Sequence, residues 1–88
     1  MTDERILKLL INKDEKALYK LSGKYDKLLS YIISNIVGNR PEDVEECLND
    51  TWFSVWSLIP PKKPSVLSHF CGRITRNLSI DRPRKKYA

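Results

Sequence analysis

VLSHFCGRITRNLSIDRPRKK, the segment from Val66 to Lys86, decides the fold of this chain. Apolar residues recur in it at intervals of three and four, which is the spacing of one face of an α-helix. They are Leu67, Phe70, Cys71, Ile74 and Leu78. We therefore expect a helix over residues 66–82 whose apolar face, including Ile74, is buried in a core. Pro83 should end this helix because its ring clashes with the carbonyl four residues earlier.

A second face of the same segment is polar and basic. Its members recur every four residues or lie beside that row, and they are Arg73, Arg76, Asn77 and Asp81. Residues 60–88 hold eight lysines and arginines against one acid, a net charge of +7, whereas residues 1–59 hold eight against ten acids, a net charge of −2. The alternative is a solvated basic face with Asp81 paired to an arginine. Because the two parts differ by nine charges, we favour a surface that binds a polyanion such as nucleic acid.

Three further helices are expected before this segment. Residues 3–12 predict a short amphipathic helix, which Asp3 can cap. Asp14 can cap a long helix over residues 15–37, and a third helix is expected over residues 41–58. No stretch alternates between apolar and polar residues as a strand would. The sequence therefore predicts an all-α fold, a compact bundle of three main helices plus a short N-terminal helix, in one domain over residues 1–88.

Two glycines and a proline punctuate these helices. Gly23 lies inside the long helix, where it costs about 1 kcal/mol relative to alanine and indicates close packing or a bend. Gly38 is suited to end that helix, and Pro41 is suited to open the next one. Residues 60–65, PPKKPS, predict a stiff, basic and extended loop before the last helix.

The third helix is expected to carry an acidic face. Asp43, Glu46 and Asp50 are spaced three and four apart, and Asn49 lies beside them. A solvated acidic surface is the usual meaning of such a charge run. However, the three aromatic residues that follow cannot all be buried in so small a core; they are Trp52, Phe53 and Trp56. Exposed aromatic residues beside acids favour a surface that docks a basic partner helix.

The sequence offers no catalytic constellation. His69 is the one histidine, and the sequence shows no obvious serine or carboxylate partner for it. Cys47 and Cys71 lack zinc-site spacing and are expected to fill core positions. Without a glycine-rich phosphate loop either, we expect no enzyme, no metal and no cofactor. No signal peptide or membrane-spanning stretch is recognisable, and we expect a soluble, reduced, cytoplasmic protein.

Three segments together resemble a known family. They are DVEECLNDTWFSVW at residues 43–56, the IPP-x-x-P pattern at 59–64, and ITRNLSIDRPRKK at 74–86. Together they resemble the second conserved region of the extracytoplasmic-function sigma factors, which are small bacterial transcription initiation factors. The likeness extends over residues 14–86, because LYKLSGKYDKLLSYI at 18–32 looks like that family's first long helix. The proline pattern looks like the form found in Firmicutes.

The resemblance implies two partners and assigns residues to each. In the family, the third helix binds the clamp helices of the largest subunit of core RNA polymerase; the matching residues are Asp43, Glu46, Asn49, Asp50, Trp52 and Trp56. The loop before the last helix traps a base flipped from the non-template strand of the minus-ten promoter element, and the last helix contacts the same DNA. Here the implied DNA-binding residues are Lys62, Lys63, Ser68, His69, Arg73, Arg76, Asn77, Arg84 and Lys85. Asn77 matches the family's asparagine, and Asp81 is expected to orient an arginine.

Two departures from the family pattern are visible. Pro83 stands where the motif usually carries a large apolar or aromatic residue, which affects the path of Arg84. The family's second DNA-binding domain, a helix-turn-helix, does not follow before Ala88, so we expect this chain to lack it. The resemblance implies a transcription initiation domain that binds core polymerase and melts the minus-ten element. The alternatives are a module that binds only protein, either polymerase or an anti-sigma factor, and a general basic nucleic-acid binder.

Overall fold

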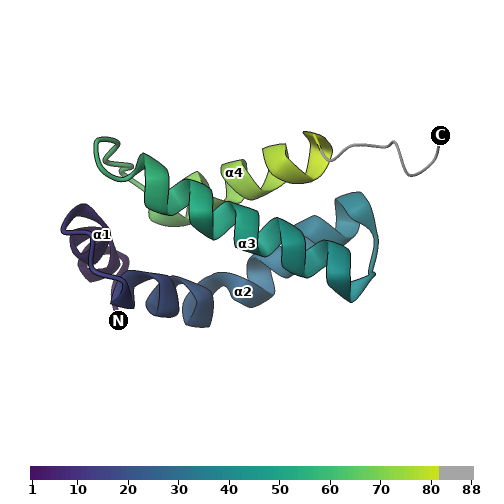
Figure 1. Ribbon diagram of the computed structural model, residues 1–88, viewed down its shortest axis with the longest axis horizontal. Coiled ribbons are helices and arrows are strands. Elements are labelled where there is room, and N and C mark those ends of the chain that lie inside the picture. The colour runs from purple at the N-terminus through teal and green to yellow at the C-terminus, as the bar shows by residue number, and fades with distance from the viewer. Residues whose placement is uncertain (82–88) are drawn as a thin grey trace.

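The computed structural model describes residues 1–81, which contain four helices and no strand. They are α1 (Asp3–Ile11), α2 (Lys16–Val37), α3 (Pro41–Leu58) and α4 (Leu67–Asp81). The predicted all-α fold is confirmed, and the predicted helix bounds lie within a residue of the observed ones. The exception is the end of the last helix, because the predicted end at residue 82 and the stop at Pro83 lie outside the described residues. In Figure 1, α2, α3 and α4 run alternately in opposite directions, and α1 lies at the end of the bundle where α3 leads into α4.

Most helix ends follow from local capping chemistry. Glu15 occupies the cap position of α2 and makes no side-chain cap hydrogen bond; the carboxylate of the preceding Asp14 accepts a hydrogen bond from the Lys16 backbone N–H at 3.0 Å. Gly38 ends α2 with a φ of 101°, and its N–H donates to the carbonyl of Ser34. Pro41 is the first residue of α3, as predicted.

The predicted cap of α1 is wrong. Thr2, which has an extended backbone, accepts a hydrogen bond from the Arg5 N–H on its hydroxyl at 3.3 Å. Asp3 is instead the first residue of the helix, and its carboxylate is bound by Lys24 and Tyr25 of α2, each at 2.6 Å. Asp3 therefore holds α1 to α2 rather than capping its own helix.

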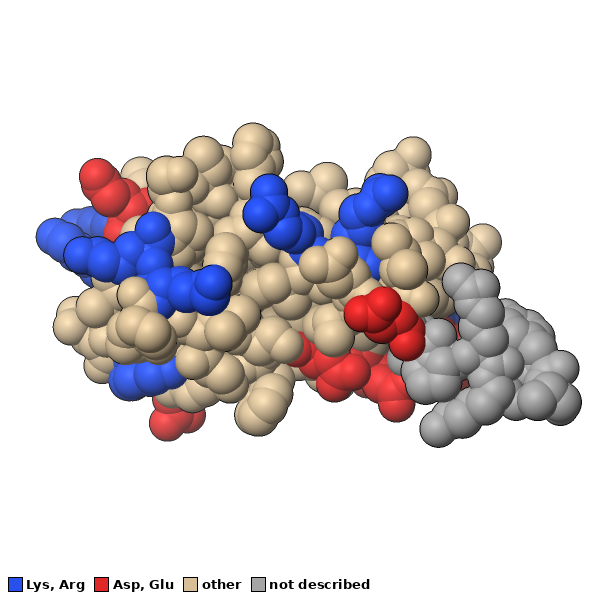
Figure 2. Space-filling model, turned by 90° about the horizontal axis from the view of Figure 1, so that it is seen from above, with Lys and Arg blue, Asp and Glu red and all other residues tan. Residues whose placement is uncertain are grey.

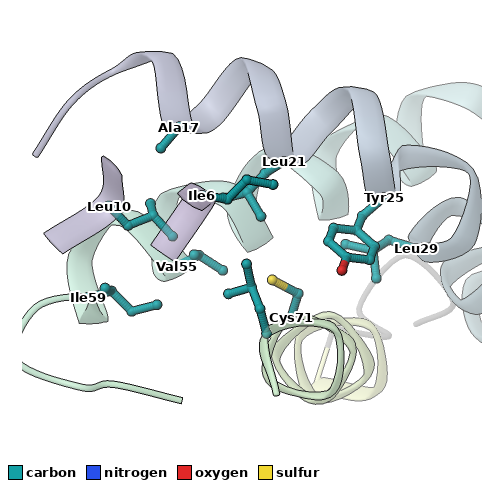
Figure 3. Close-up of a cluster of buried hydrophobic side chains, with 10 residues drawn as sticks. Ile6, Leu10, Ala17, Leu21, Tyr25, Leu29, Val55, Ile59 and Cys71 are labelled. Atoms are coloured by element: carbon teal, nitrogen blue, oxygen red, sulfur yellow. The ribbon is translucent and has the colours of Figure 1, made fainter. Parts of the chain in front are cut away.

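The core is built from one buried row on each helix. The rows advance in steps of four residues and consist of Ile6 and Leu10; Ala17, Leu21, Tyr25, Leu29 and Ile33; Cys47, Thr51 and Val55; and Leu67, Cys71, Thr75 and Ser79. Figure 3 shows such side chains from all four helices converging with Ile59, which follows α3. Cys47 and Cys71 are both buried, so their predicted core positions are confirmed.

The buried face of α4 differs from the expected one. Leu67 and Cys71 are buried as predicted, but Thr75 and Ser79 take the remaining inward positions. Ile74, which we expected to be buried, is only partly buried and packs at the flank with Phe70. Residues that are four apart line up along a straight contact between helices, and small side chains let the two backbones approach closely.

A hydroxyl pair joins α3 to α4 inside the core. The Thr51 and Thr75 hydroxyl oxygens are 2.6 Å apart, and Thr51 also donates to the Cys47 carbonyl at 2.8 Å. Because α3 and α4 are antiparallel, moving four residues in opposite directions from this pair brings Val55 to the level of Cys71. The contact between α3 and α4 therefore has small side chains along its length. The Thr51–Thr75 pair also fixes which sides of the two helices face each other, and so which sides face outward.

Candidate protein-binding and nucleic-acid-binding faces

The outer face of α3 lies opposite its buried row. Turning about 100° per residue from Thr51 brings Phe53 to the far side of the helix. Phe53 is 71% exposed. The exposed polar residues on this side include Glu42, Glu46, Asn49 and Asp50. Glu42, Glu45, Glu46 and Asn49 also line a shallow hollow of 380 Å³ with Pro41 at the start of the helix. We call these residues, with Phe53, the acidic face.

The two tryptophans predicted to dock a partner are not the exposed aromatic residues. Trp52 is partly buried, and its indole N–H donates to the Asp26 carboxylate of α2 at 3.3 Å. Asp26 also accepts the Ser22 hydroxyl at 2.6 Å. Trp52 thus holds α3 to α2. It follows the buried Thr51 directly, and this position on α3 directs its side chain toward α2.

Trp56 is also held within the bundle. It is partly buried, and the Lys13 ammonium lies 4.5 Å from the centre of its ring. The same ammonium donates to the Trp56 carbonyl. The prediction that the three aromatic residues cannot all be buried is confirmed: Trp52 and Trp56 are partly buried, and the exposed member is Phe53. Its position opposite the row Cys47–Thr51–Val55 was the signal available in the sequence.

The outer face of α4 is polar and basic. His69, Arg73, Arg76 and Asn77 are all exposed, as predicted, because they lie away from the buried row. We call these four residues the basic face. Figure 2, viewed from the side of α4, shows lysine and arginine side chains over the middle of the molecule and over the end that carries the loop. Many of the acids in view gather toward the other end.

The remaining predicted DNA-binding residues are distributed differently. Ser68 is partly buried and lies beside the Tyr25 phenol rather than on the basic face. Arg84 and Lys85 lie outside the described residues. Lys62 and Lys63 are exposed in the loop before α4.

The prediction of a fully extended loop between α3 and α4 is wrong, because the loop begins with a turn. Ile59 is fully buried, and the Lys62 N–H donates to the Leu58 carbonyl at 2.9 Å, so residues 59–61 form a turn. Beyond this turn, Pro64 and Ser65 line a hollow of 190 Å³ together with Leu67 and with Asp3, Glu4 and Leu7 of α1. The turn and the buried Ile59 hold the two lysines at one end of the bundle.

A polar network at the base of α1 has the most perturbed titratable groups. Hydrogen bonds from Lys24 and Tyr25 lower the pKa of Asp3. Burial, followed by the hydrogen bond to Asp3, raises the pKa of Tyr25. Burial raises the pKa of the Cys71 thiol to about 12, with a smaller effect from Asp3. The thiol therefore stays protonated at neutral pH, which does not suit a nucleophile.

Among residues 1–81, no group of three or more histidine, cysteine, aspartate or glutamate side chains is arranged to hold a metal ion. Within the same range, no helix has both the length and the apolar character that crossing a membrane requires.

Comparison with known proteins found no family model, no curated protein and no solved structure that matches this chain. Any function therefore has to be argued from the acidic face, the basic face and the motifs of the sequence.

Proposed function

We propose that this chain is a promoter-recognition domain of the sigma-factor type, with its acidic face on core RNA polymerase and its basic face on promoter DNA. The observation that carries the proposal is the separation of charge between two adjacent helices. The acidic face of α3 and the basic face of α4 project from antiparallel helices joined by the Thr51–Thr75 pair. One small domain could thus hold two partners of different chemistry at the same time.

The acidic face suits a helical protein partner that carries arginines. Carboxylates such as Glu46 and Asp50 form charge-assisted hydrogen bonds with guanidinium groups. Phe53, at 71% exposure, offers an apolar anchor among them, and interfaces concentrate their binding energy in such aromatic residues. We assign this face to the clamp helices of the largest polymerase subunit.

The basic face suits a separated strand of the minus-ten element. Arg73 and Arg76 can neutralise phosphates, which gives affinity without sequence preference. The amide of Asn77 has both a donor and an acceptor, so it can read the edge of a base. Lys62 and Lys63 extend the positive surface to the loop, where capture of an unstacked base would favour the melted promoter. The domain acts by binding alone, in the cytoplasm where polymerase works.

The test is equilibrium binding to a panel of minus-ten single strands with one base changed at a time, at two salt concentrations. Wild type should prefer certain bases, and Asn77→Ala should lose that preference. Arg73→Ala should weaken binding to every strand and reduce the salt dependence. Equal affinity of wild type for promoter-like and scrambled strands would overturn promoter reading.

A module that binds only protein is the second candidate, and the exposure of Phe53 favours it. An exposed phenylalanine among acids serves a protein partner, whether polymerase or an anti-sigma factor, and contributes nothing to DNA reading. On this alternative, Asn77→Ala leaves every measured affinity unchanged, whereas Phe53→Ala still weakens the complex with polymerase.

A further inference from the structure

We propose that the outer face of α2 is a second nucleic-acid contact, at which a shallow hollow accepts one nucleotide of a single strand. The base would lie against Tyr19, and the phosphates would lie along Lys20 and its neighbouring lysines. This surface uses no residue of the basic face or of the α3–α4 loop. It therefore goes beyond the proposed promoter reading and can be tested separately from it.

The first observation is a row of lysines on one side of α2. The row consists of Lys16, Lys20, Lys24 and Lys27. Spacings of four, four and three residues keep them on one face, about 6 Å apart along the axis for each four-residue step. Lys24 is paired with Asp3 at 2.6 Å; within residues 1–81, the other three ammonium groups are exposed and form no ion pair.

Asp3 balances Lys24, but Lys16, Lys20 and Lys27 have no acid in an ion pair with them within residues 1–81. The only acid of α2 is Asp26, which is turned toward α3 and accepts hydrogen bonds from Ser22 and Trp52. Many of the other acids of residues 1–59 are on the acidic face. A net charge of −2 for that part of the chain therefore conceals a cationic helix face.

The second observation is a hollow on this face. It has a volume of 460 Å³ and is lined by Met1, Tyr19, Lys20, Gly23 and Lys24. Tyr19 is 83% exposed, so its ring is open to a ligand. Lys24 is paired with Asp3, but an exposed ring next to Lys20, which forms no ion pair within residues 1–81, combines the stacking surface and the charge that single-stranded nucleic acid uses.

The third observation is that Gly23 has no structural reason to be glycine. A Cβ built on it meets nothing within 4 Å, and its φ is not positive. Alanine would favour the helix more, so neither packing nor backbone conformation explains the residue. The missing side chain leaves open the space between Tyr19, one turn earlier, and Lys24. We infer that the space is kept for a ligand.

Nucleic acid fits these features better than the other polyanions. An acidic peptide would need the lysines but not the hollow, and an anionic membrane would favour a broader apolar wedge. Four residues beyond Lys27, Tyr31 is 67% exposed and offers a second ring on the same face. Two exposed rings with lysines between them match a strand that alternates bases and phosphates.

The experiment measures binding of the full chain to a fluorescein-labelled oligothymidine by fluorescence anisotropy. Gly23→Gln fills the hollow with an uncharged side chain that suits a helix, and Tyr19→Ala removes the ring. Each should raise the Kd by about fivefold or more, as expected for loss of one stacked base. Gly23→Gln should melt no lower than wild type, which separates loss of binding from loss of fold.

The matched control is Lys8→Gln, which removes an exposed charge from α1, beside Lys20→Gln on α2. Lys20→Gln should weaken binding more than Lys8→Gln does. Wild-type affinity for Gly23→Gln and Tyr19→Ala would overturn the proposal, as would equal effects of the two lysine variants. Competition by polyglutamate or by anionic phospholipid vesicles that equals that of unlabelled oligothymidine would overturn the assignment to nucleic acid.

The binding measurements distinguish failure of the proposed site on α2 from failure of the proposed promoter reading. Asn77→Ala should abolish base preference on minus-ten strands without changing the effect of Gly23→Gln on oligothymidine. If Gly23→Gln has no effect while Asn77→Ala abolishes base preference, the hollow on α2 is refuted and the proposed function stands.

Discussion

Helices α3 and α4 pack on each other through similar inner faces, whereas their outer faces differ in charge and chemistry. Inside, both use small or apolar residues four apart, and Thr51 of one is bonded to Thr75 of the other. Outside, α3 exposes acids around Phe53, and α4 exposes arginines around Asn77. On our proposal, the inner faces of α3 and α4 therefore stabilise the fold, and their outer faces select the binding partners. Substitutions on inner and outer faces should therefore have separable effects.

The largest loss of stability is expected from a substitution at Ile59, which directly follows α3. Ile59 is fully buried, so Ile59→Ala should destabilise the fold by about 2–5 kcal/mol. Ile74→Ala should cost less because Ile74 is only partly buried. Urea unfolding followed by far-UV circular dichroism measures both. Equal losses for the two variants would contradict the full burial of Ile59 and the partial burial of Ile74.

A smaller loss is expected where the two inner faces meet. Thr75→Val removes the hydroxyl pair but leaves Thr51 the Cys47 carbonyl as acceptor. The expected cost is therefore one internal hydrogen bond, about 0.5–1.5 kcal/mol. Asn77→Ala, two residues further on the outer side, should change the free energy of unfolding by less than about 0.5 kcal/mol. If Asn77→Ala lowered the free energy of unfolding more than Thr75→Val does, the outer side of α4 would contribute more to stability than the inner side, contrary to this prediction.

A gain in stability is expected on the outer side of α2. Gly23→Ala should stabilise the fold by about 0.4–1 kcal/mol because its Cβ meets open space. The matched control is Gly38→Ala, which should destabilise because Gly38 has a φ of 101°. Thermal melts of the two variants should shift in opposite directions; a shift of both in one direction would refute this account of the glycines.

The smallest effect is expected from pH at the base of α1. Since the pKa of Asp3 is lowered below 3.8 in the folded state, the stability it contributes is present above that value and lost as pH falls through the lowered pKa. Asp3→Asn should cost less than about 1 kcal/mol at pH 7, because the pair with Lys24 is partly exposed to solvent. The difference from wild type in urea unfolding should shrink as the pH falls below 3.8. An unchanged difference would show that the charge of Asp3 contributes nothing.

Much of the fold could be predicted because its signals are local. Pro41, Gly38 and Asp14 set helix ends through their own backbone and side-chain chemistry, so the predicted ends lie close to the observed ones. The depth of each side chain was harder to predict, because it depends on the direction from which neighbouring helices approach. Trp52 and Phe53 are adjacent in sequence, yet one is held by Asp26 and the other faces solvent.

The candidate sites were predictable to a similar degree. The exposed basic face of α4 was anticipated because its residues share a helical spacing and carry the excess charge. The hollow on α2 was not anticipated, since charge summed along the chain mixes residues that the fold places on different sides. A binding role for Tyr19 and Gly23 can be proposed only from the structure, in which they line the same hollow as Lys20 and Lys24.

The most direct test of the central claim crosses two outer-face variants with two partners. Asp50→Lys and Arg73→Glu are each assayed for co-purification with core RNA polymerase and for binding to a minus-ten single strand, with circular dichroism as the check on folding. Asp50→Lys should lose polymerase and keep the strand, whereas Arg73→Glu should lose the strand and keep polymerase. If either folded variant loses both partners, or if neither loses any, the two faces do not have separate partners.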